Sequence, residues 1–291
     1  MTHADLSVYG GYTQAELDAQ YNQATLVPDL SPFFARWEAE SRTARERFKV
    51  VANLPYGAGE DERLDVFPAQ QSGTPVHVFL HGGAWAVQGK NRFGYPANLL
   101  VPAGACHVVP EFSIAPKVTL DEMVRQVRAA FAWVYRHIAE YGGNPGHIVA
   151  SGHSSGAHLL AMVLADGWRE AAGLPADLIK GAVLISGPYD LEPVRHSARN
   201  TYLHLDAAAA HRNTPIHQLG PQTPPLFVGW GDGDLPEFKR QGQHFAALCR
   251  EKGIAVTQAE FANTNHFEIS YAFADPQHLV GQTLQSMLGQ G

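Results

Sequence analysis

Gly152-His153-Ser154-Ser155-Gly156 is the stretch of sequence that decides the fold. It has the form G-x-S-x-G, and the flanking patterns predict a strand over residues 147–150 and a helix over residues 157–164. A serine on a tight turn between a strand and a helix projects its hydroxyl above a sheet. Ser154 has glycine two residues to each side, which keeps the turn free of side chains, whereas Ser155 does not. We therefore predict that Ser154 is a catalytic nucleophile.

Outward from this turn, short apolar segments alternate with helical patterns. We expect strands at residues 64–67, 76–80, 106–110, 147–150, 181–185, 226–228 and 255–261. We expect helices at residues 28–50, 119–141, 157–164, 237–252 and 276–288. This alternation is typical of βαβ units, so the sequence predicts an α/β fold with a mostly parallel central sheet and helices on both faces. Because no stretch resembles a linker, we predict one domain over residues 1–291, with cap elements at 28–50 and 190–222.

The composition excludes several classes of protein. Lys and Arg number 21 and Asp and Glu 28, a net charge of −7 with no basic block, so no nucleic-acid partner is expected. No apolar run approaches the about 20 residues that cross a bilayer, so no membrane partner is expected, and residues 1–5 lack the features of a secretory signal. Cys106 and Cys249 have no metal-binding spacing, which favours free buried thiols and a cytoplasmic location.

A second motif, His81-Gly82-Gly83-Ala84-Trp85, follows the strand expected at residues 76–80. Consecutive glycines let backbone N–H groups approach a ligand with no Cβ in the way. Acyl-transfer enzymes need such donors where negative charge develops on the carbonyl oxygen. We predict an oxyanion hole from the N–H groups of Gly82, Gly83, Ala84 and Ser155.

Such a site needs a histidine base, and the chain has 15 histidines. His266 lies in the loop after the last expected strand, where a base can reach Ser154. His153 lies in the serine turn and His158 on the helix after it, and we expect both to be structural or to line the pocket. His266 is therefore the predicted base.

The predicted acid has three candidates. Asp232 and Asp234 share the turn after the strand expected at residues 226–228, and Asp190 follows the preceding strand. An acid in any of these turns could orient the imidazole of His266 and stabilise its cation. Spacing alone leaves all three open.

Four motifs resemble the kynurenine formamidase (arylformamidase) family, and they occur in order along the chain. They are His81-Gly82-Gly83-x-Trp85, Gly152-His153-Ser154-x-Gly156-Ala157-His158-Leu159, Asp234-x-Pro236-Glu237-Phe238 and His266-Phe267-Glu268-Ile269. The resemblance implies an α/β-hydrolase fold, a Ser–Asp–His triad and hydrolysis of N-formyl-L-kynurenine. It also places the acid on Asp234, because the family's acid lies in a Gly-x-x-Asp-x-Pro-Glu-Phe turn. One residue departs from the pattern, since many members have Tyr where this chain has Ala84.

The expected activity is that of a serine hydrolase that cleaves a formyl-like aryl amide through an acyl-enzyme. Two alternatives stay open: a carboxylesterase on small or aryl esters, and a non-catalytic small-molecule-binding protein of this fold. The expected partner is a small amide or ester, no cofactor or metal is expected, and a homodimer is compatible with the sequence. The predicted pocket walls are Trp85, His153, Tyr189 and Phe267, with Phe93 and Tyr95 as further aromatic candidates.

Overall fold

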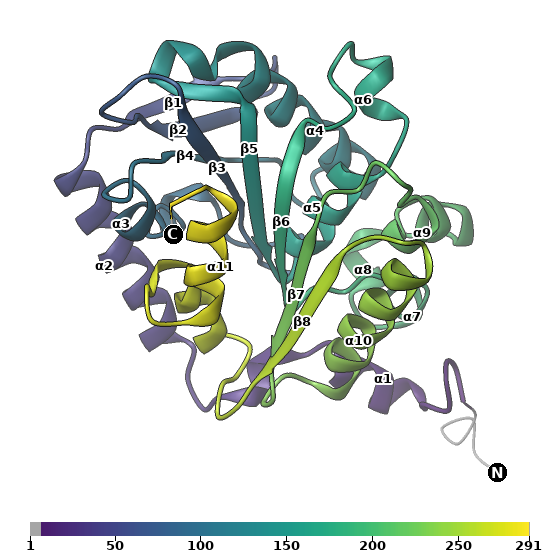
Figure 1. Cartoon of the computed structure of the whole chain (residues 1–291). Helices are drawn as coiled ribbons and strands as arrows, with labels where there is room; N and C mark the ends of the chain where they lie inside the picture. Colours follow the sequence, from purple (N-terminus) through teal and green to yellow (C-terminus); the bar gives the residue numbers. More distant parts are fainter. Residues whose placement is uncertain (1–6, 291) are drawn as a thin grey trace.

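An eight-stranded sheet forms the centre of the computed structural model, which describes residues 7–290 (Figure 1). The strands are β1 (Val51–Pro55), β2 (Arg63–Phe67), β3 (Thr74–Leu80), β4 (Cys106–Pro110), β5 (Gly143–His153), β6 (Ile179–Ile185), β7 (Leu226–Gly231) and β8 (Val256–Phe261). Their order in the sheet is β1-β2-β4-β3-β5-β6-β7-β8. Strands β1 and β2 pair antiparallel with their neighbours, and all pairs from β4 to β8 are parallel. The predicted α/β fold with a mostly parallel sheet is confirmed.

Helices cover both faces of this sheet (Figure 1). The longer ones are α2 (Ser31–Arg47), α4 (Leu120–His137), α5 (Ser155–Leu164), α10 (Pro236–Glu251) and α11 (Leu279–Met287). The shorter ones are α1 (Gln14–Gln20), α3 (Ala97–Leu100), α6 (Trp168–Ala171), α7 (Glu192–His196), α8 (Asn200–Leu203) and α9 (Ala207–Arg212). The 3₁₀ helices are η2 (Gln23–Leu26), η3 (Lys90–Arg92), η4 (Ile138–Tyr141), η5 (Pro215–His217) and η6 (Glu268–Ala274).

The core has two parts, one on each face of the sheet. Alternate residues of a strand point to opposite faces, so Val78 packs into one part and Phe79 into the other. The first part is closed by α4, α5 and α10, and the second by α2, α3, η6 and α11. Parallel strands covered on both faces are typical of α/β proteins.

Local signals fix the longest helix, α4. The side chain of its N-cap, Thr119, accepts a hydrogen bond from the N–H of Glu122, and two acidic residues occupy the first turn. The apolar stripe runs from Leu120 to Val134 and is buried. Gly142, at φ +85°, ends the 3₁₀ turn that follows, because a left-handed backbone favours glycine.

The structure corrects several predicted boundaries and adds one strand. Strand β5 begins at Gly143, before the strand expected at residues 147–150, so only Gly142 separates η4 from the strand. Strand β1 was not predicted, because it is an edge strand with mixed exposure. The helix expected at residues 28–50 spans Ser31–Arg47. The region 190–222 holds α7, α8 and α9, and the single-domain assignment stays a prediction.

Other expectations concern the cysteines and the membrane. Cys106 and Cys249 are free and buried, as predicted. Within residues 7–290, no helix has both the length and the apolar composition needed to cross a membrane. The expectation about a secretory signal rests on residues 1–5, which lie outside the described residues.

The N-terminal segment lies against the short helices that follow β6. The side chain of Gln14 donates a hydrogen bond to the carbonyl oxygen of His196 at 2.8 Å. The carboxylate of Asp18 accepts from the N–H of Ala198 at 2.5 Å. These contacts bring residues 14–26 over the carboxyl ends of the parallel strands, where α/β proteins place their ligands.

Candidate active site

Ser154 occupies the turn between β5 and α5, with φ +55° and ψ −126°. A Cβ on Gly152 would lie 2.5 Å from the carbonyl oxygen of Gly156, and a Cβ on Gly156 would lie 2.2 Å from that of Leu80. Both positions therefore require glycine. The N–H of Ser154 donates to the carbonyl oxygen of Ile185 at 2.8 Å and ties the turn to β6. This strained backbone is the geometry that lifts a serine hydroxyl above a sheet.

His266 lies in the loop after β8, and its imidazole bridges two side chains. Nε2 lies 3.0 Å from Oγ of Ser154, and Nδ1 lies 2.6 Å from Oδ1 of Asp234. Because the carboxylate only accepts, Nδ1 carries the proton, and Nε2 is free to accept one from the serine. The three side chains are buried and form one continuous chain of hydrogen bonds.

Asp234 is held by two further donors. Its Oδ2 accepts from the hydroxyl of Ser186 at 2.6 Å and from the N–H of Gly231 at 3.2 Å. Burial by itself raises the pKa of Asp234, but the charge of His266 and the hydrogen bonds from His266 and Ser186 outweigh it and lower that pKa below its ordinary value. The carboxylate is therefore ionised beside the imidazole.

The other two acid candidates lie elsewhere. Asp232 is exposed, and its carboxylate accepts from the N–H groups of Asn263 and Thr264, so it shapes the loop before His266. Asp190 accepts from the N–H of Glu192 and from Tyr9. Of the three candidates, the structure brings only Asp234 to the imidazole.

The glycine turn after β3 runs beside the serine. A Cβ on Gly82 would lie 3.1 Å from Cβ of Ser154, and the backbone is left-handed at Gly83 (φ +122°) and Ala84 (φ +55°). Within residues 7–290, no hydrogen bond uses the N–H groups of Gly82, Gly83, Ala84 or Ser155. These donors are available to an oxygen atom above Ser154.

His81, which begins this turn, is fixed by its neighbours. Its ring stacks on Phe112 with the centroids 4.5 Å apart and on Phe93 at 5.3 Å. Nδ1 lies 2.7 Å from the carbonyl oxygen of Gly82, and Nε2 lies 3.3 Å from Oε1 of Glu111. His81 thereby holds the backbone of the turn and does not face the serine.

A cavity of about 620 Å³ opens above Ser154. Its walls come from η2, α2, the glycine turn, the serine turn, α8 and the His266 loop. The predicted residues that line it are Ser154 and His266 together with Gly82, Gly83, Ala84, Phe93, His153 and Phe267. Lining residues that the sequence analysis missed include Tyr21, Gln23, Phe34, Trp37, Arg199 and Tyr202.

The prediction of Trp85, Tyr189 and Tyr95 as pocket walls is wrong. Trp85 has φ +61°, which turns its ring under α5, where Nε1 donates to Nδ1 of His158 at 3.1 Å. Tyr189 stacks on Phe245 of α10 with the centroids 4.1 Å apart. Tyr95 donates its hydroxyl proton to the carbonyl oxygen of Ser270 in the second part of the core.

The two other histidines near the serine are neutral. Burial, then the charge of His266, lowers the pKa of His153 to about 3, and its Nε2–H donates to the carbonyl oxygen of His266 at 2.9 Å. Burial lowers the pKa of His158 to about 4, and its Nε2–H donates to the carbonyl oxygen of Asn213. Among residues 7–290, no three His, Cys, Asp or Glu side chains form a group that could hold a metal.

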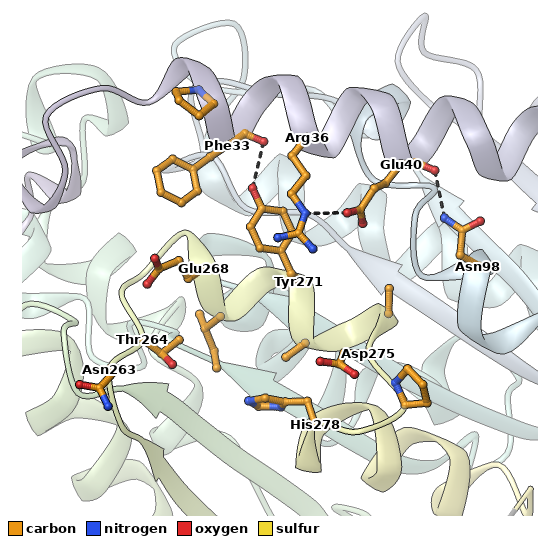
Figure 2. Close-up of a pocket in the computed structure, with 15 residues that line it drawn as sticks. Phe33, Arg36, Glu40, Asn98, Asn263, Thr264, Glu268, Tyr271, Asp275 and His278 are labelled. Carbon is orange, nitrogen blue, oxygen red and sulfur yellow. Dashed lines mark hydrogen bonds and ion pairs between the residues drawn. The ribbon is translucent and has the colours of Figure 1, made fainter.

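A larger cavity, about 770 Å³, lies between α2 and η6 (Figure 2). We call it the α2–η6 groove. None of Ser154, Asp234 and His266 lines it. Figure 2 shows three interactions between residues that line it: Arg36 pairs with Glu40, Tyr271 donates its hydroxyl proton to the carbonyl oxygen of Phe33, and Asn98 donates to that of Glu40.

Comparison with known families and proteins finds hydrolases. A family model described as BD-FAE matches residues 64–247. Kynurenine formamidase of Danio rerio is 30% identical over 98% of this chain and 100% of its own length. Kynurenine formamidase of Salmo salar is 36% identical over 85% of each chain. Esterase LipQ of Mycobacterium tuberculosis is 29% identical over 82% of this chain and 62% of its own.

Solved structures share the fold. A protein of Silicibacter sp., with a provisional thioesterase description, is 25% identical over 94% of this chain and 99% of its own, with a TM-score of 0.81. An esterase of Pyrobaculum calidifontis is 18% identical over 93% of this chain and 97% of its own, with a TM-score of 0.71.

Proposed function

The chain belongs to the kynurenine formamidase-like family of α/β-hydrolases, and from that premise we propose that it is a serine hydrolase which removes a formyl-like acyl group from an aryl amide such as N-formylkynurenine. The enzyme class, a hydrolase acting on an amide or an ester, follows from its relatives. The proposal adds the serine mechanism and the substrate.

The first half of the reaction uses the hydrogen-bonded chain of Ser154, His266 and Asp234. Oγ of Ser154 attacks the carbonyl carbon while Nε2 of His266 takes the hydroxyl proton. Asp234 keeps the imidazole in the required tautomer and stabilises its cation. The tetrahedral intermediate collapses, the C–N bond breaks, and His266 gives its proton to the leaving arylamine.

The negative oxygen of the intermediate needs donors that are already in place. The unbonded N–H groups of Gly82, Gly83, Ala84 and Ser155 are suited to this role, and one such donor is worth about 3 kcal/mol of transition-state stabilisation. Water then attacks the acyl-enzyme, with His266 as its base, and releases the acid and Ser154.

The observation that carries this proposal is the pair of distances at His266, 3.0 Å to Oγ of Ser154 and 2.6 Å to Oδ1 of Asp234, at the floor of an open cavity. The test compares kcat/KM on N-formylkynurenine and on p-nitrophenyl acetate for the wild type and for Ser154→Ala. We expect the formamide to be the better substrate and Ser154→Ala to lose both activities. Turnover retained in Ser154→Ala would overturn the serine mechanism.

A carboxylesterase is the second candidate, and the similarity to esterase LipQ favours it. The same three side chains serve esters and amides, so the chemistry of the leaving group separates the candidates. A wild-type preference for p-nitrophenyl acetate over N-formylkynurenine would replace the first proposal by this one.

A further inference from the structure

Arg199 lies in the wall of the cavity above Ser154, and its guanidinium is only partly satisfied. The residue is 7% exposed. Nε donates to the carbonyl oxygen of Tyr21 at 3.1 Å, and Nη2 donates to the same oxygen at 2.9 Å and to Oε1 of Gln23. Nη1 is buried and has no hydrogen-bond partner among the described residues.

Gln23 repeats this pattern in the same wall. Its Oε1 accepts from Arg199, and because a guanidinium only donates, the orientation of the amide is fixed. Its Nε2 is buried and also has no partner within the part of the chain that the structure describes. Two hydrogen-bonded residues of one cavity wall therefore each carry a buried donor that lacks an acceptor.

The charge of Arg199 is also unbalanced. Within residues 7–290, no carboxylate lies within ion-pair distance of its guanidinium, which instead faces the rings of Tyr21, Trp85 and Phe238 at 5.6 to 5.9 Å. Asp18 is the one acidic residue in the cavity lining, and its Oδ1 already accepts from Ala198 and Gln14. A buried charge is unfavourable unless a counter-charge accompanies it.

We propose that Arg199 and Gln23 bind a carboxylate of the substrate, so that the enzyme selects acidic amides or esters over neutral ones. The inference rests on the proposed function for the position of the reacting bond, and it names the class of molecule that the cavity takes. Its carboxylate accepts from Nη1 of Arg199 and Nε2 of Gln23, while its carbonyl group lies over Ser154. N-formylkynurenine fits this description, because it carries an α-carboxylate on the chain beside its formamide.

A binding experiment tests this without any change at Arg199. Ser154→Ala protein is titrated by calorimetry with L-kynurenine and with kynuramine, which is the same molecule without the carboxylate. A charge-assisted pair of hydrogen bonds predicts at least about tenfold tighter binding of L-kynurenine. Equal dissociation constants would overturn the proposal. Because nothing is hydrolysed here, this outcome is independent of whether the wild type cleaves formamides.

Two variants then locate the effect. Arg199→Met removes the guanidinium, and we expect the preference for L-kynurenine over kynuramine to disappear. Arg195→Met is the matched control, since Arg195 lies in α7, pairs with Glu192 and does not line the cavity. In Arg195→Met, the preference for L-kynurenine over kynuramine should equal that of the Ser154→Ala protein without this second change. A preference that survives Arg199→Met in folded protein would contradict the assignment.

Turnover separates this inference from the proposed function. Each pair of substrates compares a molecule that carries a free carboxylate with one that does not. The amide pair is N-formylkynurenine and N-formylkynuramine. If amides are not cleaved, the ester pair is 2-acetoxybenzoate and its methyl ester. Hydrolysis of esters alone overturns the formamide proposal, and a preference for the acidic ester would still support the carboxylate site. Equal kcat/KM within each pair overturns the site, whichever bond is cleaved.

Discussion

Two cavities share α2 as a wall, and they differ in how the charge of an arginine in each is balanced. Phe34 and Trp37 face the cavity above Ser154, whereas Phe33, Arg36 and Glu40 face the α2–η6 groove. In the groove Arg36 lies over Tyr271 and bonds to Glu40, so its charge is balanced within the protein (Figure 2). In the cavity, no carboxylate of residues 7–290 pairs with Arg199, and its Nη1 has no hydrogen-bond partner among them.

The difference teaches that volume alone does not mark a functional site. The groove is the larger of the two, at about 770 Å³ against about 620 Å³. Only the smaller cavity combines unsatisfied donors, a strained serine and a linked acid and base. The strained serine with its linked acid and base distinguishes it. An unpartnered polar atom does not, because Oδ1 of Asn98 in the groove is also buried without a hydrogen-bond partner among the described residues.

The largest expected effect is the difference in kcat between substitutions of Asp234 and of Asp232. Asp234→Asn should lower kcat by about ten-thousandfold, because the amide stabilises the wrong tautomer of His266. Asp232→Asn, two residues away, should change kcat less than about threefold, since its carboxylate accepts from the backbone N–H groups of Asn263 and Thr264 and is not bonded to His266. Steady-state kinetics on one substrate compares them. The reverse result would move the acid to Asp232.

Two histidines, His153 in the cavity above Ser154 and His278 in the groove, should contribute differently to the pH dependence of the free energy of unfolding. The pKa of His153 is about 3 in the folded protein against roughly 6.5 in the unfolded chain, so the unfolded state binds the extra proton. Its contribution is complete above about pH 6.5 and is lost as the pH falls toward 3, at up to about 1.4 kcal/mol per pH unit. His153→Asn should flatten this slope.

His278, in the groove, is the control for that measurement. Burial lowers its pKa, but the side chain is only half-buried. His278→Asn should therefore change the slope less than His153→Asn does. Urea unfolding at a series of pH values between 4 and 7 measures both, and equal slopes in the two variants would contradict the difference in burial.

The two faces of α2 provide a third test. Phe34→Ala removes an aromatic wall of the cavity and should lower kcat/KM by about tenfold, mainly through KM. Arg36→Ala, on the groove face, should leave kcat/KM within about twofold and stability within about 0.5 kcal/mol. A larger kinetic effect at Arg36 would give the groove a part in the reaction.

The smallest effect concerns backbone strain. Ser154→Gly should raise the free energy of unfolding by about 1 kcal/mol, because glycine adopts φ +55° and ψ −126° without a steric penalty. Asn263→Gly, at φ +54° in the groove, should change it by less than about 0.5 kcal/mol, since asparagine tolerates that region. Thermal unfolding compares both, and an unchanged Ser154→Gly would mean that the turn is unstrained.

The sequence predicted the parts of this molecule that depend on short-range patterns. Apolar runs located the central strands, and Gly152, Gly156 and the order of Ser154, Asp234 and His266 located the residues that meet at the cavity floor. The resemblance was needed for Asp234, because two aspartates in one turn have the same local pattern and differ only in which way they point.

The cavity walls were not predictable in this way. Gln23 and Arg199 meet through long-range hydrogen bonds that leave no periodic signal in the chain. Trp85 was misassigned because its left-handed backbone reverses the direction of the ring, and one sequence does not reveal the sign of φ at a residue other than glycine.

The position of the N-terminal segment bears on how this enzyme could change over evolution. Residues 18–37 supply much of the cavity wall, yet they precede the first residue of the BD-FAE match at position 64. They contribute nothing to the sheet and nothing to the hydrogen bonds of Ser154. Selection for a new substrate can therefore change the side chains of this stretch while Ser154, Asp234 and His266 stay the same.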